Sequence, residues 1–264
     1  MRSTLQGLWK RRHLLWILVS SHLKRSSRSS ALGLMWWFID PLLMAGVYYV
    51  VVVAIFKRGG SHQPYVLFLV CSLFAWKSFS DTVSASVIVL KRQAPIIKAV
   101  SFPMAVLPFS HAIADTIFFG FSLVVAAGIA SAYGPTHGTW PSFAYLLLVV
   151  PTAIQMVLAA GVALILSTLG VFFTDLQNIV RHLLRICFYL GPGLYDLDTV
   201  PERFRGLYQL NPFAGLMTSY REIIMQGKAP EAAHLLVPGV LAVLVFAVGY
   251  VLFRRYEGRF VQYV

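Results

Sequence analysis

The protein is a chain of 264 residues, of which 58% are hydrophobic and 12% are charged, and its mean hydropathy is +0.72. Soluble domains carry about 25% charged residues, so this composition excludes a water-soluble domain and indicates an integral membrane protein. The formal net charge of +12 does not indicate a nucleic-acid partner, because the Lys and Arg residues lie where membrane topology places them and form no separate basic domain.

The N-terminal residues 5–25 alternate Leu, Trp and Ile with Lys and Arg. This composition is typical of a helix that lies in the lipid headgroup layer, and the seven-residue spacing of Trp9 and Trp16 favours such a helix over a solvated basic tail. The apolar stretch Leu14 to Val19 is short and lacks a small-residue cleavage site, so we expect the segment to be retained.

Six later runs are long and apolar enough to span a bilayer, which takes about 20 residues. They cover residues 33–56, 64–90, 103–133, 141–172, 178–196 and 235–253. The sequence therefore predicts an all-α polytopic membrane protein with six transmembrane helices. We expect one domain over 1–264, with an interfacial helix in 1–32, a six-span core in 33–253 and a tail in 254–264.

The distribution of basic residues predicts the orientation of these spans. With the N-terminus in the cytoplasm, the cytoplasmic segments hold 15 Lys and Arg residues and the outer loops hold 6. We therefore expect both termini in the cytoplasm.

Residues 172–212 have the pattern of a helix, a break, a short helix and a second break. The breaks are Gly191-Pro192-Gly193 and Asn211-Pro212, and the pattern predicts short re-entrant helices before the last span. Irregular backbone at membrane depth is tolerated where protein or a water-filled cavity satisfies its polar groups, so this segment indicates a conduction path.

The cytoplasmic stretch 91–103 is too short for a domain, yet two prolines bound an apolar stripe in it. We interpret it as a short helix that docks another protein rather than as a solvated connector, because its apolar side chains are expected to be exposed together. The candidate docking residues are Pro95, Ile96, Ile97, Lys98, Val100 and Phe102.

Charged residues inside spans are costly and need partners. Lys77 and Asp81 are four residues apart and are expected to pair on one helix face. Asp40 precedes Pro41, which disfavours helical geometry, so it is expected to cap a helix restart or to lie near a lateral substrate entrance. His111 and Asp115, also four apart, are expected to hydrogen-bond a neighbouring span, with a proton relay as the alternative.

An ordered set of short motifs resembles one known family. It comprises Trp36-Trp37 leading into Asp40-Pro41, Ile97-Lys98 before Phe102-Pro103, Phe172-Phe173-Thr174-Asp175, Tyr189 with Pro192 and Tyr195, Val200-Pro201-Glu202-Arg203, Leu210-Asn211-Pro212 and Tyr256-Glu257. In this order, nearly end to end, they resemble the permeases of type 2 ABC exporters, in the branch that exports O-antigen, capsule and teichoic-acid polymers.

The resemblance implies a homodimer with two copies of a separate ATPase subunit on its cytoplasmic face. It implies that an undecaprenyl-linked polysaccharide, O-antigen first and capsule or teichoic acid next, crosses the bacterial inner membrane. The permease itself is then no enzyme and binds no cofactor or metal, and the partner uses ATP and Mg. The chain agrees with this division, because its Gly227-Lys228 pair is followed by Ala229 and lacks the first glycine of a P-loop.

Aromatic rings that stack on the flat C–H faces of sugars are the candidates to line the substrate channel. They are Trp36, Trp37, Tyr48, Tyr49, Phe188, Tyr189 and Tyr195, with interfacial anchoring as the alternative. The candidates for a gate or entrance are Asp40, Pro192, Arg203 and Arg205. Arg203, Arg205 and Arg221 are expected to meet phosphate or acidic sugars, or else to anchor lipid headgroups.

Other functions remain as alternatives. A drug or small-lipid exporter with the same permease fold has the same sequence features, and a proton-coupled secondary transporter would depend on Asp115 or His111 and need no ATPase. The sequence has no His-Glu-x-x-His or Cys-x-x-Cys metal motif and no catalytic acid cluster for a glycosyltransferase.

Overall fold

The computed structural model of the protein describes residues 12–28, 33–55, 64–99, 102–195 and 200–264. Within these ranges all regular structure is helical, so the all-α prediction is confirmed. Five helices there are long and apolar enough to cross a membrane. They are α3 (Trp36–Tyr49) with the π-helical turn η2 (Val50–Ile55), α4 (Tyr65–Ser86), α7 (Val106–His137), α8 (Val149–Phe172) with the preceding 3₁₀ turn η3 (Phe143–Leu148), and α12 (Ala232–Tyr256).

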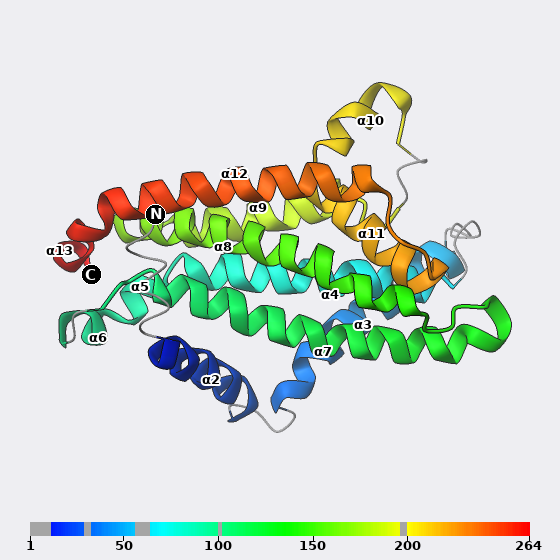
Figure 1. Cartoon of the computed structure of the whole chain (residues 1–264), viewed down its shortest axis with the longest axis horizontal. Helices are drawn as coiled ribbons and strands as arrows, with labels where there is room; N and C mark the ends of the chain where they lie inside the picture. The colour runs from blue at the N-terminus through cyan, green and yellow to red at the C-terminus, as the bar shows by residue number, and fades with distance from the viewer. Residues whose placement is uncertain (1–11, 29–32, 56–63, 100–101, 196–199) are drawn as a thin grey trace.

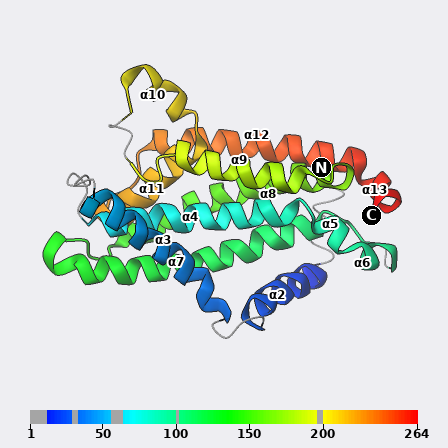
Figure 2. The same ribbon diagram turned by 180° about the vertical axis from the view of Figure 1, so that it is seen from behind.

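These five helices form an elongated bundle in which α4 is central (Figures 1 and 2). In its most hydrophobic stretch 72% of the α4 residues are buried, against 11% for α3. Phe68, Phe74 and Phe118 belong to the main apolar cluster of the bundle. The helix α3 is thus a peripheral span with most of its apolar surface uncovered.

The spans α8 and α12 lie side by side along the bundle (Figure 1). Gly161 and Gly249 stand at their contact, and a Cβ atom on Gly161 would lie 2.6 Å from the backbone nitrogen of Phe246. Helices in membranes associate closely where small residues let their backbones approach. Glycine at this contact therefore permits the close packing of α8 on α12.

Shorter helices lie at both ends of the bundle. At one end are α5 (Val89–Arg92), α6 (Ala94–Ala99), the turn η5 (Glu257–Arg259) and α13 (Phe260–Tyr263), and the helices α10 (Glu202–Gln209) and α11 (Pro212–Gln226) lie toward the other (Figure 1). Asn211 caps α11 by accepting a hydrogen bond from the backbone nitrogen of Phe213 at 3.0 Å, and Pro212 takes the first helical position. The short helices predicted before the last span are therefore present.

The end that holds α6 and α13 has its own apolar cluster. It contains Ile97 of α6, Phe253 of α12 and Phe260 of α13, and Glu257 accepts a hydrogen bond from the backbone nitrogen of Met104 at 3.1 Å. The 91–103 stretch and the C-terminal tail are therefore packed together.

The expected span over 178–196 differs from the structure. Its helix, α9 (Leu176–Leu190), has 15 residues and carries Arg181, His182 and Arg185 among apolar side chains. It is shorter than the roughly 20 residues that a span needs, because Gly191-Pro192-Gly193 ends it. The described residues hold five helices of sufficient length to span the membrane, and α9 is a shorter, strongly amphipathic helix beside them.

The expectation for Asp40 is corrected, and the expected N-terminal helix is present. The helix α3 continues through Asp40 and Pro41, so Asp40 does not cap a helix restart. Pro41 lies beyond the first turn of α3, so it removes one backbone hydrogen bond of the helix without ending it. The N-terminal helix, α2 (Arg12–Arg28), lies obliquely against α7 outside the bundle (Figure 1), and Trp9 of the predicted pattern is outside the described residues.

Candidate functional site

A groove of about 300 Å³ lies between α3, α4 and α9. In Figure 2, α3 and α9 are on the side of the bundle that faces the viewer. Its walls combine charged, aromatic and aliphatic side chains. The lining residues are Asp40, Pro41, Met44, Tyr48, Leu73, Trp76, Lys77, Ser80, Asp81, Arg185, Phe188 and Tyr189. Asp40, Met44 and Tyr189 are exposed, so the groove opens on the surface of the chain.

Lys77 is the electrostatic centre of the groove. Its Nζ lies 3.2 Å from a carboxylate oxygen of Asp81, one turn along α4, and 3.8 Å from one of Asp40 on α3. The same ammonium lies 5.6 Å from the ring centroid of Trp37. The predicted pair of Lys77 and Asp81 is confirmed, and Asp40 extends it into a three-charge cluster that joins two spans.

Tyrosine and phenylalanine side chains form the aromatic wall of the groove. The hydroxyl of Tyr48 donates to that of Tyr189 at 3.3 Å, which links α3 to α9. The ring of Phe188 lies 6.3 Å from that of Tyr48 and 5.7 Å from that of Trp76, centroid to centroid. Such a wall offers π-faces and hydroxyl groups beside carboxylates and cations, which suits a polar ligand with flat C–H faces.

The seven aromatic channel candidates separate into three groups. Tyr48, Phe188 and Tyr189 line the groove. Trp37 is 8% exposed and stacks on Phe118, so it is a core residue, and the ammonium of Lys77 lies over its ring. Trp36 and Tyr49 are exposed on α3 outside the groove lining, and Tyr195 donates hydrogen bonds to the carbonyls of Tyr189 and Leu190 at the end of α9.

The break after α9 is held by Arg221, which lies on α11. Arg221 is 5% exposed, and its Nη2 donates to the carbonyls of Pro192 at 2.7 Å and of Gly193 at 3.2 Å and to the hydroxyl of Ser72. Its guanidinium carbon lies 3.4 Å from the ring centroid of Phe68. The expectation that Arg221 meets headgroups or acidic sugars is therefore wrong, because its partners are protein groups from distant segments of the chain.

The two gate arginines, Arg203 and Arg205, lie on α10, which projects away from the bundle (Figure 1). Arg203 is exposed with its guanidinium 4.7 Å from the ring centroid of Phe204, and the Nε of Arg205 donates to the carbonyl of Val200 at 3.0 Å. They remain gate candidates and do not line the groove.

The docking segment does not expose all its apolar side chains. Pro95, Ile96 and Lys98 are exposed on α6, but Ile97 is 6% exposed and packs into the terminal cluster. Phe102 is half-buried against the same cluster, and Val100 lies outside the described residues. The face that α6 can offer a partner is thus Pro95, Ile96 and Lys98.

Asp115 makes the contact predicted for it with a neighbouring span. Thr82 of α4 donates from Oγ1 to Oδ2 of Asp115 at 2.8 Å, and Ser78 donates to the Asp115 carbonyl at 3.2 Å. The other carboxylate oxygen lies 3.4 Å from Nε2 of His22 on α2. This network connects α4, α7 and α2 and lies outside the groove lining.

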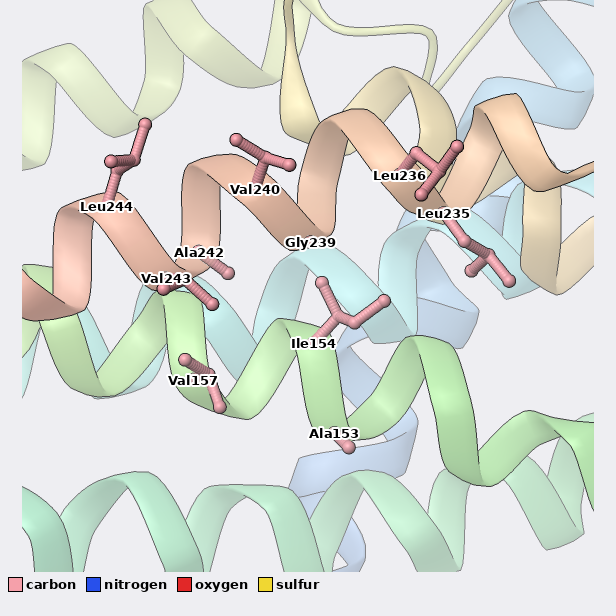
Figure 3. A pocket seen from close by; sticks show the side chains of 10 residues that line it. All are labelled: Ala153, Ile154, Val157, Leu235, Leu236, Gly239, Val240, Ala242, Val243 and Leu244. Carbon is pink, nitrogen blue, oxygen red and sulfur yellow. The ribbon is translucent and has the colours of Figure 1, made fainter.

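A larger cavity, of about 580 Å³, lies between α8 and α12 (Figure 3). All its lining side chains are apolar, among them Ile154, Val157, Val240 and Leu244. It offers no group that recognises a polar ligand, so the smaller groove with its charges and hydroxyls is the candidate functional site.

Comparison with known proteins gives a consistent result. Residues 13–225 match the family described as ABC-2 type transporter. The chain is 32% identical over 253 residues to an O-antigen export system permease protein RfbA of Myxococcus xanthus, with 95% of each chain covered. It is 30% identical over 250 residues to an RfbA of Klebsiella pneumoniae, with 94% of each covered, and 24% identical over 113 residues to the polysialic acid transport protein KpsM of Escherichia coli, with 43% and 44% covered.

Proposed function

Because the chain belongs to the ABC-2 type transporter family, we propose that it is the membrane-spanning subunit of an ATP-driven exporter of cell-surface polysaccharide. Relatives at 30% and 32% identity over nearly the whole chain are O-antigen export permeases. O-antigen is therefore the first candidate cargo, with capsule or teichoic acid next.

The observation that carries the proposal is the mixed lining of the groove. Tyr48, Phe188 and Tyr189 present rings while Asp40 and Lys77 present charges. A glycan needs hydrogen-bond partners for its hydroxyls and flat apolar surfaces for its C–H faces, and weak contacts of both kinds guide a moving polymer without holding it. We infer that the groove is one wall of the path that the polymer takes.

The second wall is provided by another copy of the chain. The buried residues of α9 are Val180 and Phe188, and the helix otherwise presents both apolar side chains and Arg181 and Arg185 at the surface. Charged groups are costly against lipid tails, so they face protein or a water-filled cavity. A homodimer that places α3 and α9 of both copies around one channel satisfies this requirement.

The energy for export comes from a separate ATPase subunit. Two copies of this ATPase bind each permease dimer. Lys91 and Arg92 belong to α5, and Arg254 and Arg255 belong to the last turn of α12. The helix α5 and the end of α12 lie toward the end that holds α6 and α13 (Figure 1). By the positive-inside rule this end is cytoplasmic, with both termini, in the inner membrane of a bacterium. The exposed face of α6 then meets the ATPase, which binds ATP and Mg.

We propose that the cargo is attached to undecaprenyl and moves from the inner to the outer leaflet. The groove opens sideways on the chain at Asp40 and Met44, so a lipid-anchored polymer can enter it while its tail stays in the bilayer. A drug or small-lipid exporter is the alternative that the experiment below separates.

The test is export in the bacterium that encodes the chain, with the gene deleted and variants supplied on a plasmid. Deletion should remove the polysaccharide from the cell surface, and the unexported polymer should accumulate inside the cell. Tyr48→Ala and Tyr189→Ala should each lower the export rate by about three- to tenfold, as expected for a lost ring contact, while Phe121→Ala, an exposed aromatic of α7 outside the groove, should not.

Surface polysaccharide that persists after deletion would overturn the cargo assignment. A drug or lipid phenotype in the same strain would then favour the small-molecule exporter. Equal effects of the Tyr189 and Phe121 substitutions would contradict the assigned path.

A further inference from the structure

Two histidines and an aspartate meet where α2 packs on α7. His22 comes from α2, while His111 and Asp115 lie one turn apart on α7. Their ligand atoms all lie within 4.8 Å of one another, and the rings of His22 and His111 are 4.4 Å apart, centroid to centroid, with their planes at 72°. His22 and His111 are 89 positions apart in the sequence, and His111 and Asp115 are four apart. A short sequence motif therefore cannot predict this cluster.

The chemistry of this set is that of a transition-metal site. Imidazole nitrogens and a carboxylate oxygen are ordinary ligands of Zn²⁺, and three protein ligands leave one position for water. At Zn²⁺ distances of about 2.0–2.1 Å, two neighbouring ligand atoms of a tetrahedron stand about 3.4 Å apart. Nε2 of His22 and Oδ1 of Asp115 are 3.4 Å apart.

The surroundings of Asp115 also match those of a metal-binding carboxylate. Ligating carboxylates usually accept a hydrogen bond on their other oxygen, which fixes their orientation. Oδ2 of Asp115 accepts one from Thr82 at 2.8 Å, so Oδ1 is directed to His22. Asp115 is 3% exposed in a membrane-spanning helix, where a carboxylate requires a compensating positive charge.

We propose that His22, His111 and Asp115 bind one divalent transition-metal ion, Zn²⁺ in the first place. The ion clamps the N-terminal helix α2 to the span α7. This site is separate from the groove between α3, α4 and α9 and does not rest on the proposed export function.

The experiment uses the full chain, purified in detergent with a removable tag that contains no histidine and stripped with a chelator. Titration with Co²⁺ should give the intense visible bands of a tetrahedral nitrogen and oxygen site, saturating at one ion per chain, and Zn²⁺ should bleach them. His22→Gln and His111→Gln should each weaken binding by tenfold or more. His137→Gln, a histidine at the exposed end of α7, should bind as the wild type does.

Thermal unfolding gives an independent readout. Zn²⁺ should raise the melting temperature of the wild type and of His137→Gln, and it should leave that of the double variant His22→Gln with His111→Gln unchanged. If a variant does not fold, the wild-type titration alone decides. A wild type that shows no tetrahedral Co²⁺ bands, or no Zn²⁺ shift, overturns the proposal and leaves only the 3.4 Å contact of His22 with Asp115.

Discussion

Arg221 shows how one side chain can fix the geometry of a backbone break. The carbonyls of Pro192 and Gly193 have no helical partner, because the chain leaves α9 there. Arg221 supplies donors to both of them from α11 and stacks on Phe68 of α4. The planar fork of a guanidinium suits this combination, which the point charge of a lysine does not reproduce.

Substitution of Arg221 is therefore expected to loosen the break and destabilise the bundle. Arg221→Gln should lower the free energy of unfolding by about 1.5–3 kcal/mol, the usual value for hydrogen bonds to a charged group, and Arg221→Lys should recover less than half of the loss. Denaturation of the purified chain in detergent measures both. Arg255→Gln, at an exposed position of α12, is the control and should be nearly neutral.

Lys77 makes a second prediction at the residue scale. Its removal leaves the carboxylates of Asp40 and Asp81 together without their cation. Lys77→Met should therefore destabilise the chain, and Asp81→Asn added to it should restore part of the loss. The double-mutant cycle should give a coupling of about 0.5–3 kcal/mol, whereas Lys77→Met combined with Glu231→Gln, at an exposed residue before α12, should be additive. An additive result for the first pair would refute the cluster.

At the scale of single elements, α6 has two roles, packing on the bundle and docking of a partner. The sequence pattern predicts only docking for its apolar residues. Ile96 is 43% exposed and Ile97 is 6% exposed. The helix α6 has six residues, of which Ile97 is buried. Successive side chains of a helix point in different directions, so Ile97 faces the bundle while Ile96 faces away from it. Ile97 supports the terminal cluster and Ile96 is left for a partner.

Aspartate at these two positions should therefore have opposite effects. Ile96→Asp should keep the melting temperature of the wild type, lose the co-purifying ATPase and abolish export. Ile97→Asp should destabilise the chain by about 3 kcal/mol or more, because it places a charge in an apolar cluster. If Ile96→Asp retained the ATPase in normal amount, α6 would not be the docking element.

The same elements show what the sequence can predict. Long apolar runs identify the spans because hydrophobic length is a property of the chain alone, and the Asn211-Pro212 pair identifies the start of α11 because capping is local. The pairing of Lys77 with Asp81 follows from helical spacing. The burial of Ile97 and of Arg221, and the approach of His22 to Asp115, depend on contacts between distant segments, which no local pattern contains.

At the scale of the whole molecule, the uneven burial of the spans is the main feature to explain. The helix α4 is covered on nearly all sides, while α3 and α9 leave most of their surface open on one side of the bundle (Figure 2). Lipid can cover the apolar part of that surface, but Arg181 and Arg185 of α9 exclude a purely lipid neighbour. The side that carries the groove is therefore the side where we expect a second copy.

Cross-linking in native membranes tests that arrangement. In a background with Cys71→Ala and Cys187→Ala, single cysteines at the exposed positions Leu43 of α3 and Leu190 of α9 should join two copies with a short thiol cross-linker. Cysteines at Val124 of α7 and Val243 of α12, which are at least as exposed as Leu43 and Leu190 but lie on other helices, should not. Cross-linking at Val243 without cross-linking at Leu43 would move the contact between copies to the α8–α12 side. The aromatic groove would then face lipid, and the proposed polymer path would have to be abandoned together with the proposed dimer.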